Sequence, residues 1–462
     1  MHSTLRALAG KLAAGFLIAL PVLAQPALVQ PAFAQQEFTA NLAGHTLLPA
    51  RTFIPAPADA PEDLKVSGKF TGGTRVEALG TVMGRSAGRP TGLSLPFNGQ
   101  PVQGHSGIKM MPDGTAWVLT DNGFGSKANS PDAMLFFSRV KLNWESGNIE
   151  RQETVFLHDP DKKVPFRITH EGTAKRYLTG SDFDLEGIQI INGKAWMGDE
   201  FGPYLIRADL TGKVEAVFET MVDGKLARSP DHPGVSTQAM PAAPGAFTVR
   251  RSRGYEGLAS SPDGNFLYGL LEGPLWDAEK KDWEKTVDGK EYLRILEFDV
   301  KSEKWTGRFW RYVLDQNGFA IGDFNMLDAT TALIIERDNG EGTADKACPA
   351  GQRAETCFHD LAKFKRVVKI EMNEANQAKD VRKIAFIDLM KIQDPNKKAR
   401  KPLNNGVLTF PFFTIENVDR VDARHIVVGN DNNLPFSSSR DPNMVDDNEM
   451  ILLEVGDFLA AR

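Results

Sequence analysis

The chain has 462 residues, and its 54 Lys and Arg stand against 60 Asp and Glu, which gives a formal net charge of -6. A protein this acidic is a poor candidate for binding nucleic acid or an anionic membrane surface. We therefore expect neither as a partner and consider small molecules instead. No apolar run beyond the first residues is long enough to predict a membrane span.

The first residues have the pattern of a secretory signal peptide. Arg6 and Lys11 precede an apolar run at 12–24, and Ala-Phe-Ala at 32–34 fits a small-residue cleavage site. The apolar run is too short to be a convincing membrane span. Cleavage after residue 34 is our prediction, and cleavage at the end of the apolar run is the alternative.

These features predict a signal peptide over residues 1–34 and one mature domain over 35–462, with its core motifs at 100–455. The leader has no twin-arginine pair and no lipid-anchoring cysteine follows it, which indicates Sec-type export to the periplasm or the medium. Cys348 and Cys357 share a polar loop, and in an oxidising compartment they predict one local disulfide. Two free thiols, or a two-cysteine metal site, are the alternatives. We expect a monomer.

One hairpin recipe recurs along the chain. Each copy has a polar residue, usually an acid, then a glycine, an apolar strand, a tight turn, and a second apolar strand that ends in acids or amides. Asp-Gly and Asn-Gly turn signals separate the two strands in several copies. The copies lie at residues 105–123, 184–203, 255–274, 321–340 and 415–433. A hairpin repeated in this way predicts the blades of a β-propeller, an all-β fold.

The five copies and a further strand pair near residues 75–82 predict six blades, with five and seven left open. Neighbouring copies are separated by more than the roughly 40 residues that one four-stranded blade needs, so insertions lie between them. The last strand, at 450–455, is expected to pair with an N-terminal strand and close the ring, which removes open sheet edges. The insertions either cover a site or are solvated excursions, and they lie at 221–253, 276–290, 340–365 and 390–409.

Three acids occupy the same place in the repeat. Glu186, Glu256 and Glu416 stand just before a Gly or an Asn at the start of the first strand. Since the innermost strand of a propeller blade lines the central channel, these side chains are expected to converge on the axis. Carboxylates that close need a counter-ion, and Ca²⁺ suits a set of oxygen ligands best. Asp323 is the fourth predicted ligand. The alternative is that each acid caps or braces its own turn.

Other polar residues of the repeat are candidates for substrate chemistry. His105 is interpreted as the first copy's counterpart of the glutamates, and with Glu200 it is a candidate for moving protons. Arg337 offers a fork of donors to an anionic substrate oxygen, unless it pairs with neighbouring carboxylates. Acids at the ends of the second strands are expected to contact substrate, with ordinary turn chemistry as the alternative: Asp121, Glu272 and Asp431.

A G-x-S-x-G sequence occurs at 84–88, with Ser86 at its centre. A nucleophile elbow requires a preceding strand and a following helix. Pro-Thr-Gly at 90–92 follows instead, without helical periodicity, which disfavours a serine hydrolase. The sequence also lacks a P-loop, a dinucleotide fingerprint, EF-hand spacing and a Cys/His zinc pattern.

Together these segments resemble the family called esterase-like activity of phytase, a phytase-like β-propeller domain. The resemblance implies a secreted or periplasmic propeller that hydrolyses phosphate esters or other esters. In the fourth copy Gly322 and Asp323 replace the Glu-Gly pair, so that copy departs from the pattern. The resemblance covers nearly the whole mature chain and is carried by residues 184–188, 196–203, 254–258, 262–274, 336–338, 415–417 and 430–433.

The first hypothesis is therefore an exported, Ca²⁺-dependent hydrolase acting on an ester, with a phosphoester favoured. A lactonase or carboxylesterase built on the same metal site is one alternative. A non-catalytic propeller that binds a ligand or a protein, with Ca²⁺ purely structural, is the other. A phosphate site needs basic residues at its rim, and the sequence offers four candidates: Arg89, Lys109, Arg253 and Arg337.

Overall fold

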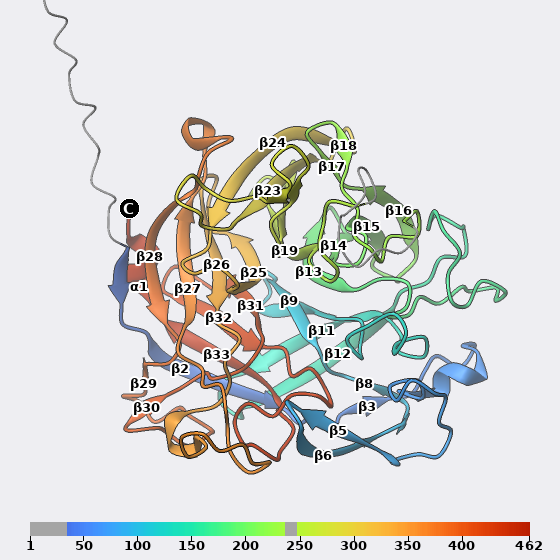
Figure 1. Ribbon diagram of the computed structural model, residues 1–462, viewed down its shortest axis with the longest axis horizontal. Coiled ribbons are helices and arrows are strands. Elements are labelled where there is room, and N and C mark those ends of the chain that lie inside the picture. The colour runs from blue at the N-terminus through green and yellow to red at the C-terminus, as the bar shows by residue number, and fades with distance from the viewer. Residues whose placement is uncertain (1–34, 236–246) are drawn as a thin grey trace, which may run out of the picture. The chain divides into compact units, whose positions relative to one another are not determined.

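Four-stranded antiparallel sheets are arranged as blades around a central axis in the computed structural model (Figure 1). The structure describes residues 35–235 and 247–462, so the predicted signal peptide at 1–34 lies outside the described residues. The all-β propeller predicted from the repeat is confirmed. Gln35–Arg462 form one compact unit.

Each of the first three blades is built from strands that follow one another along the chain. The first blade contains β9 (His105–Met110), β10 (Thr115–Thr120), β11 (Phe136–Asn143) and β12 (Asn148–Phe156). The second contains β13 (Leu185–Ile191), β14 (Lys194–Asp199), β15 (Tyr204–Asp209) and β16 (Val214–Glu219). The third contains β19 (Tyr255–Ser260), β20 (Phe266–Leu271), β23 (Tyr292–Asp299) and β24 (Lys304–Val313).

The last two blades each recruit an N-terminal strand at their outer edge. The fourth contains β25 (Ala320–Met326), β26 (Thr331–Arg337), β27 (Lys365–Glu371) and β28 (Arg382–Asp388), with β1 (Gln36–Phe38) added in parallel to β28. The fifth contains β31 (Ile415–Arg420), β32 (His425–Asn430), β33 (Asn448–Glu454) and β2 (Asn41–Leu48).

The ring is closed by pairing the two ends of the chain. β2 runs antiparallel to β33, from Asn41 opposite Glu454 to Leu48 opposite Asn448. This confirms the predicted closure, and it ties the N-terminal segment into the blade that forms last along the chain. One further residue pair, Leu47 with Asn148, joins the fifth blade to the edge of the first.

The predicted sixth blade is wrong: the described residues, 35–235 and 247–462, form five blades. The segment at 75–82 lies outside the ring, next to a separate hairpin of β5 (Val82–Ser86) and β6 (Arg89–Leu95). Ala87 and Gly88 form its turn with φ of 46° and 88°, the backbone that a two-residue hairpin turn requires. The G-x-S-x-G sequence is therefore a hairpin turn and not a nucleophile elbow.

Short elements lie outside the blades, in the N-terminal segment, in the loops and insertions, and at the C-terminal end. The two-residue strands are β3 (Phe53–Ile54), β4 (Val66–Ser67), β7 (Phe97–Asn98), β8 (Gln100–Pro101), β17 (Met221–Val222), β18 (Lys225–Leu226), β21 (Trp276–Asp277), β22 (Asp282–Trp283), β29 (Ile392–Gln393) and β30 (Val407–Leu408). The helical turns are η1 (Glu62–Lys65), η2 (Ala344–Lys346), η3 (Glu374–Asn376) and α1 (Gly456–Ala460). The predicted disulfide between Cys348 and Cys357 is confirmed in the loop after β26.

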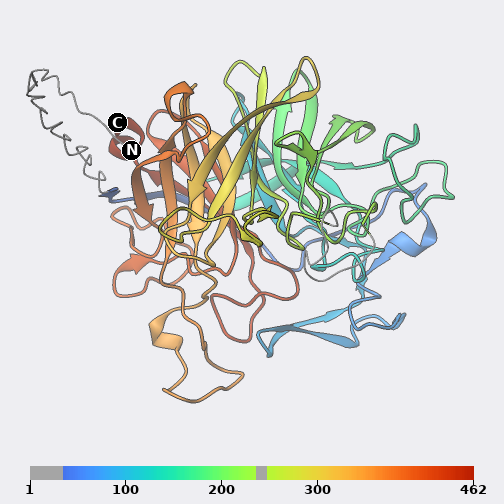
Figure 2. The same cartoon turned by 45° about the horizontal axis from the view of Figure 1, so that its top comes forward.

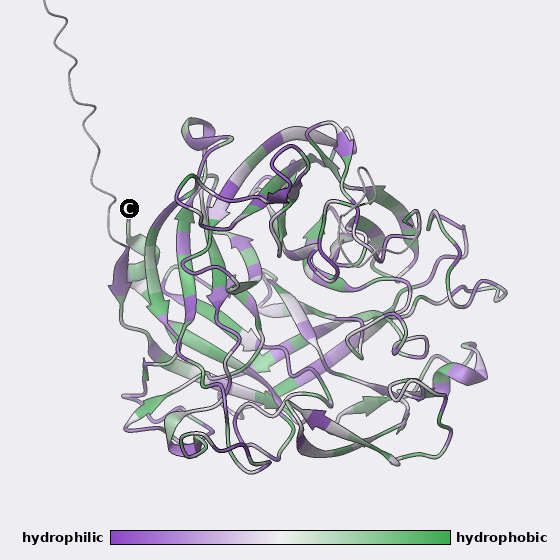
Figure 3. Ribbon diagram, viewed as in Figure 1, coloured by the Kyte–Doolittle hydropathy of each residue, from purple (hydrophilic) through white to green (hydrophobic). Residues whose placement is uncertain are grey.

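The hydrophobic core lies between neighbouring blades. One cluster joins the second and third blades, where the rings of Trp196 and Phe298 lie 5.9 Å apart. Equivalent clusters fill the other four inter-blade spaces, and the blade strands are correspondingly hydrophobic while many loops are hydrophilic (Figure 3). Burying one such large side chain contributes about 1.5–3 kcal/mol, so the ring is stabilised by the contacts between blades.

The repeated glycine follows from how closely the inner strands approach. β9, β13, β19, β25 and β31 contact one another in a closed cycle around the channel. Gly107 and Gly187 have φ of 95° and 72°, and a Cβ on Gly187 would lie 2.7 Å from the backbone nitrogen of Leu258 in the next blade. A side chain at this position would force neighbouring blades apart.

No helix within residues 35–235 and 247–462 has both the length and the hydropathy needed to span a bilayer.

Candidate functional site

A β-bulge occurs at the same place in the inner hairpin of all five blades. The register shifts immediately after the pairs His105–Thr120, Leu185–Asp199, Tyr255–Leu271, Ile321–Glu336 and Ile415–Asn430, or within two residues of them. Bulges of this kind re-aim one side chain. The residue after the first member of each pair takes the equivalent position: Ser106, Glu186, Glu256, Gly322 and Glu416.

This register corrects the interpretation of His105. His105 is equivalent to the buried apolar residues Leu185 and Tyr255, and Ser106 is the counterpart of the glutamates. Both ring nitrogens of His105 are buried without a hydrogen-bond partner. Burial lowers the pKa of His105 from 6.5 to about 4, so the ring is neutral at ordinary pH. A proton-transfer role in the cavity described below does not fit this position.

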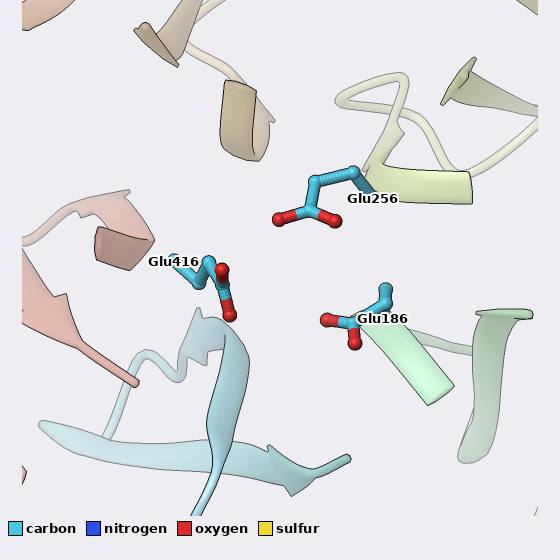
Figure 4. A group of neighbouring side chains, drawn as sticks. All are labelled: Glu186, Glu256 and Glu416. Carbon is cyan, nitrogen blue, oxygen red and sulfur yellow. The ribbon is translucent and has the colours of Figure 1, made fainter. Parts of the chain in front are cut away.

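Three glutamates converge on the channel axis. One carboxylate oxygen from each of Glu186, Glu256 and Glu416 lies within 4.8 Å of those of the other two, and the three side chains point toward one another from β13, β19 and β31 (Figure 4). All three are at most 7% exposed. Because Ca²⁺ takes oxygen ligands at about 2.3–2.6 Å, oxygens at this separation fit a single ion between them.

The electrostatics of the triad favour a cation. Burial, followed by repulsion from Glu256 and Glu416, raises the pKa of Glu186 well above 4.5. Burial also raises the pKa of Glu256, with Glu272 and Glu416 adding to the effect. Oε2 of Glu186 and Oε1 of Glu256 are buried without a hydrogen-bond partner. Buried polar atoms nearly always have a hydrogen-bond or metal partner. These two oxygens have none from the protein, and a metal ion would be a suitable partner.

Glu256 also belongs to a second acidic group. Its carboxylate and those of Glu200 and Glu272 offer oxygens within 4.8 Å of one another. Burial and then Glu272 raise the pKa of Glu200 well above 4.5, which favours the protonated form of that carboxyl group. Glu272 is ion-paired to Arg253, and this carboxylate is the main cause that raises the pKa of Arg253.

A second ring of polar residues surrounds the triad. In each hairpin, the residue of this ring directly follows the second-strand member of the residue pair named above for the bulge. The five residues are Asp121, Glu200, Glu272, Arg337 and Asp431. With the triad they line a cavity of about 270 Å³. Nη2 of Arg337 lies 3.3 Å from Oε1 of Glu416. Four acids and one arginine therefore form the rim, and the arginine is paired with a carboxylate of the triad, which is the alternative given for Arg337.

Asp323 does not line this cavity, which corrects its interpretation as a ligand. Its Oδ2 accepts hydrogen bonds from the backbone N–H groups of Ile108 (3.3 Å) and Val418 (3.0 Å). These donors belong to β9 and β31, so the carboxylate ties three inner strands together. Burial raises the pKa of Asp323 to about 7, against the lowering effect of these backbone hydrogen bonds.

The channel is blocked by side chains beside Asp323. Nδ2 of Asn325 donates to the carbonyl oxygens of Ile108 (3.2 Å) and Val418 (2.9 Å). Its Oδ1 accepts from Lys109 (3.2 Å) and Gln189 (2.8 Å). These contacts cross the channel between β9, β13, β25 and β31.

Residues 100–434 match the family described as Phytase-like, esterase-like activity of phytase. The chain belongs to this family. The comparison with curated proteins found no match. The resemblance stated from the sequence motifs is thereby confirmed.

Solved structures similar to this phytase-like protein share little sequence with it. A luciferin-regenerating enzyme is 10% identical, with 91% of this chain and 94% of that chain covered and a TM-score of 0.30. The PQQ-bound aldose sugar dehydrogenase from Streptomyces coelicolor is 13% identical, with 76% and 94% covered and a TM-score of 0.32. The Dos1 propeller is 11% identical, with 78% and 70% covered and a TM-score of 0.28. Likenesses at these scores carry no argument about activity.

Sequence reasoning missed several residues of this phytase-like site. Ser106 could have been recognised as the counterpart of the glutamates if the five hairpins had been aligned by their bulges and not by the charge of their residues. Asp184 lines the cavity, and burial raises its pKa to about 6 although Asn122 donates to it. Phe413 also lines the cavity, but it lies in the loop before β31, where the repeat gives no signal.

Proposed function

We propose that this protein is an exported, Ca²⁺-dependent hydrolase that cleaves an ester, most specifically a phosphoester. The observation that carries the proposal is the convergence of three buried carboxylates, two of which have unpartnered oxygens, beside Arg337. The proposed mature domain is 35–462 after removal of a leader at 1–34, and its disulfide suits the periplasm or the medium.

Glu186, Glu256 and Glu416 are the proposed Ca²⁺ ligands, and the ion would polarise a substrate oxygen and orient water. Glu200 belongs to the second acidic group, next to the triad. Its raised pKa suits it to protonating the leaving oxygen. The blocked channel limits water on the side opposite the rim.

The basic residues favour a phosphoester over a lactone or an acyl ester. Arg337 and Arg253 both line the cavity, next to their partners Glu416 and Glu272, and a guanidinium fork binds phosphate oxygens well. The other two candidates from the sequence are engaged elsewhere. Arg89 lies 2.6 Å from Glu341, and Lys109 lies beside Asn325 at the blocked side of the channel.

The test is metal analysis of the purified mature protein, followed by turnover assays on phosphate monoesters, lactones and acyl esters with and without a chelator. We expect bound Ca²⁺ and phosphoesterase activity that the chelator abolishes. Arg337→Lys should raise KM for the phosphoester, because lysine lacks the fork. Activity on lactones alone would replace the phosphoester assignment, and Ca²⁺ binding without turnover of any ester would favour a binding propeller.

A further inference from the structure

We propose that a side pocket next to the acidic cavity binds an uncharged, hydroxyl-bearing ring of the substrate, such as a sugar. This inference rests on the proposed function, because it names the non-reacting part of the same substrate. The side pocket has a volume of about 340 Å³, which is within the range of small-molecule sites.

The side pocket and the acidic cavity share a wall. Asn339, Phe413 and Asn433 line both. On its other side the side pocket is bounded by the β5–β6 hairpin and by the loop between β26 and β27, which project from the same side of the ring (Figure 2). A substrate can therefore place its reacting group over the glutamates and a second group beyond Phe413.

Phe413 presents an aromatic surface at this junction. Its side chain is 40% exposed although it is large and apolar. The backbone N–H of Phe413 donates to Oγ of Ser439 (3.1 Å), which fixes the loop. The guanidinium of Arg337 lies 5.6 Å from the ring centroid. A second ring, Phe436, lines the side pocket. Two such rings offer apolar faces to the C–H groups of a cyclic ligand.

The charges of the side pocket favour an uncharged ligand. Arg89 is 1% exposed and lies 2.6 Å from Glu341, so its charge is cancelled inside the wall. Its guanidinium also donates to Oγ of Ser438 (3.1 Å). Asp360 adds a negative charge to the lining. Among the lining residues that the structure describes, Arg89 is the one Lys or Arg and it is paired, so a second phosphate group would meet no unpaired Lys or Arg there and would be repelled by Asp360.

The polar side chains of the side pocket favour hydroxyl groups over an aliphatic chain. Asn339 and Asn433 carry amides that both donate and accept, and Ser86 and Ser437 contribute hydroxyls. The Asn339 side chain donates to the carbonyl oxygen of Gly318 (3.1 Å) and the Asn433 side chain donates to Oγ1 of Thr414 (2.5 Å), so each amide keeps a second N–H that an acyl chain could not use. A sugar ring can accept from these N–H groups with its hydroxyls and cover Phe413 or Phe436 with its apolar face.

The experiment measures binding of methyl glucoside, methyl galactoside and inositol to the mature protein by calorimetry, which does not require turnover. We expect at least one of these probes to bind, and we expect Asn339→Ala and Phe436→Ala each to weaken that binding by about tenfold. Asn339 is exposed, so its variant should fold. The matched control is Phe266→Ala, a partly buried aromatic residue at the end of β20 away from Glu272, and it should bind as wild type does.

Absence of binding by all three probes would overturn the proposal, as would unchanged binding in both variants. If the probes bind as expected but no ester is hydrolysed, the proposed hydrolase function fails while the side pocket stands as a sugar site. Binding and turnover measurements on the wild type and the same variants therefore distinguish the two proposals.

Discussion

Ser106 on β9 donates a hydrogen bond of 2.8 Å from its hydroxyl group to Oε2 of Glu416 on β31. The two residues occupy equivalent positions in the first and fifth blades, so the repeat itself supplies the contact. Arg337 binds the other oxygen of Glu416 at 3.3 Å. Glu416 is therefore satisfied by the protein, whereas Glu186 and Glu256 each keep an oxygen that no protein group binds.

The first prediction concerns the metal. Chelation should lower the melting temperature and remove the hydrolase activity, and added Ca²⁺ should restore both. Binding to the folded state alone contributes about 2.7 kcal/mol at a free ion concentration of 100 times Kd. Glu186→Gln and Glu256→Gln keep the side-chain shape but remove charge, so each should weaken Ca²⁺ binding by at least about tenfold. Calorimetric titration measures this effect.

The control for these variants is Glu150→Gln, which removes an exposed carboxylate from β12 and should leave Ca²⁺ affinity unchanged. Equal affinity in all three variants would argue that the glutamates brace the ring and bind no ion.

The second prediction is a pH dependence of the metal-free protein. The folded pKa values of seven acids that line the cavity are raised above the values of the unfolded chain: Asp121, Asp184, Glu186, Glu200, Glu256, Glu416 and Asp431. The folded state then binds more protons than the unfolded state, so its stability is present at low pH and is lost as pH rises through the raised pKa values. Denaturant unfolding in a chelator should show stability falling as pH rises above the ordinary carboxyl pKa values of 3.8 and 4.5.

Saturating Ca²⁺ should flatten this pH profile, because the ion replaces the protons as counter-charge. Glu186→Gln should also flatten it in the absence of metal, since one of the titrating groups is gone. A metal-free protein whose stability rises with pH above these ordinary pKa values would contradict the electrostatic account.

The fold class was predictable because five hairpins share one pattern, from His105 in the first to Ile415 in the last. The blade count was not, since the strand signals near residue 82 belong to a hairpin outside the ring. A sequence shows that a strand pair exists, but it does not show whether that pair is hydrogen-bonded to a blade.

The candidate site was predictable where the position in the repeat decides the direction of the side chain, as for Glu186 and Glu256. It was not predictable for Asp323. This residue follows Gly322, which takes the position of the glutamates, and its carboxylate accepts hydrogen bonds from backbone N–H groups of other strands. Phe413 was also missed, since a loop residue reaches its place through contacts that no periodicity describes.

The third prediction tests the structural role of Asp323. Asp323→Asn keeps only one acceptor oxygen, so its NH2 group must face either the backbone donors of Ile108 and Val418 or that of Phe324, and we expect a loss of stability of about 1–3 kcal/mol. Urea unfolding measures it. Because Asp323 does not line the acidic cavity, the folded variant should retain the Ca²⁺ affinity of the wild type. A variant that folds normally but loses Ca²⁺ would restore Asp323 to the ligand set.

The fourth prediction concerns export. Mass spectrometry of the mature protein should show cleavage near Ala34 and a Cys348–Cys357 bridge, which contributes about 2–3 kcal/mol at most because it closes a short loop. A retained leader, or two thiols that alkylate without reductant, would contradict this. Nδ1 of His359 lies 3.1 Å from Sγ of Cys348 and His359 lines the side pocket, so reduction should also alter sugar binding there.

The last prediction separates proton transfer from metal binding. Glu200→Gln removes the proton carrier but leaves Glu186, Glu256 and Glu416 in place, so turnover should fall by about 10²–10⁴-fold while Ca²⁺ affinity stays near that of the wild type. Pre-steady-state assays and calorimetry on one preparation measure both.

The competing mechanism places a nucleophile at Ser86, whose hydroxyl group lies 3.4 Å from Glu341 in the side pocket and accepts a hydrogen bond from Arg89. Ser86→Ala should therefore keep turnover of a small phosphoester within about threefold, because its loss removes hydrogen bonds and no reacting group. Full activity in Glu200→Gln together with an inactive Ser86→Ala would overturn the metal-assisted mechanism in favour of a serine one.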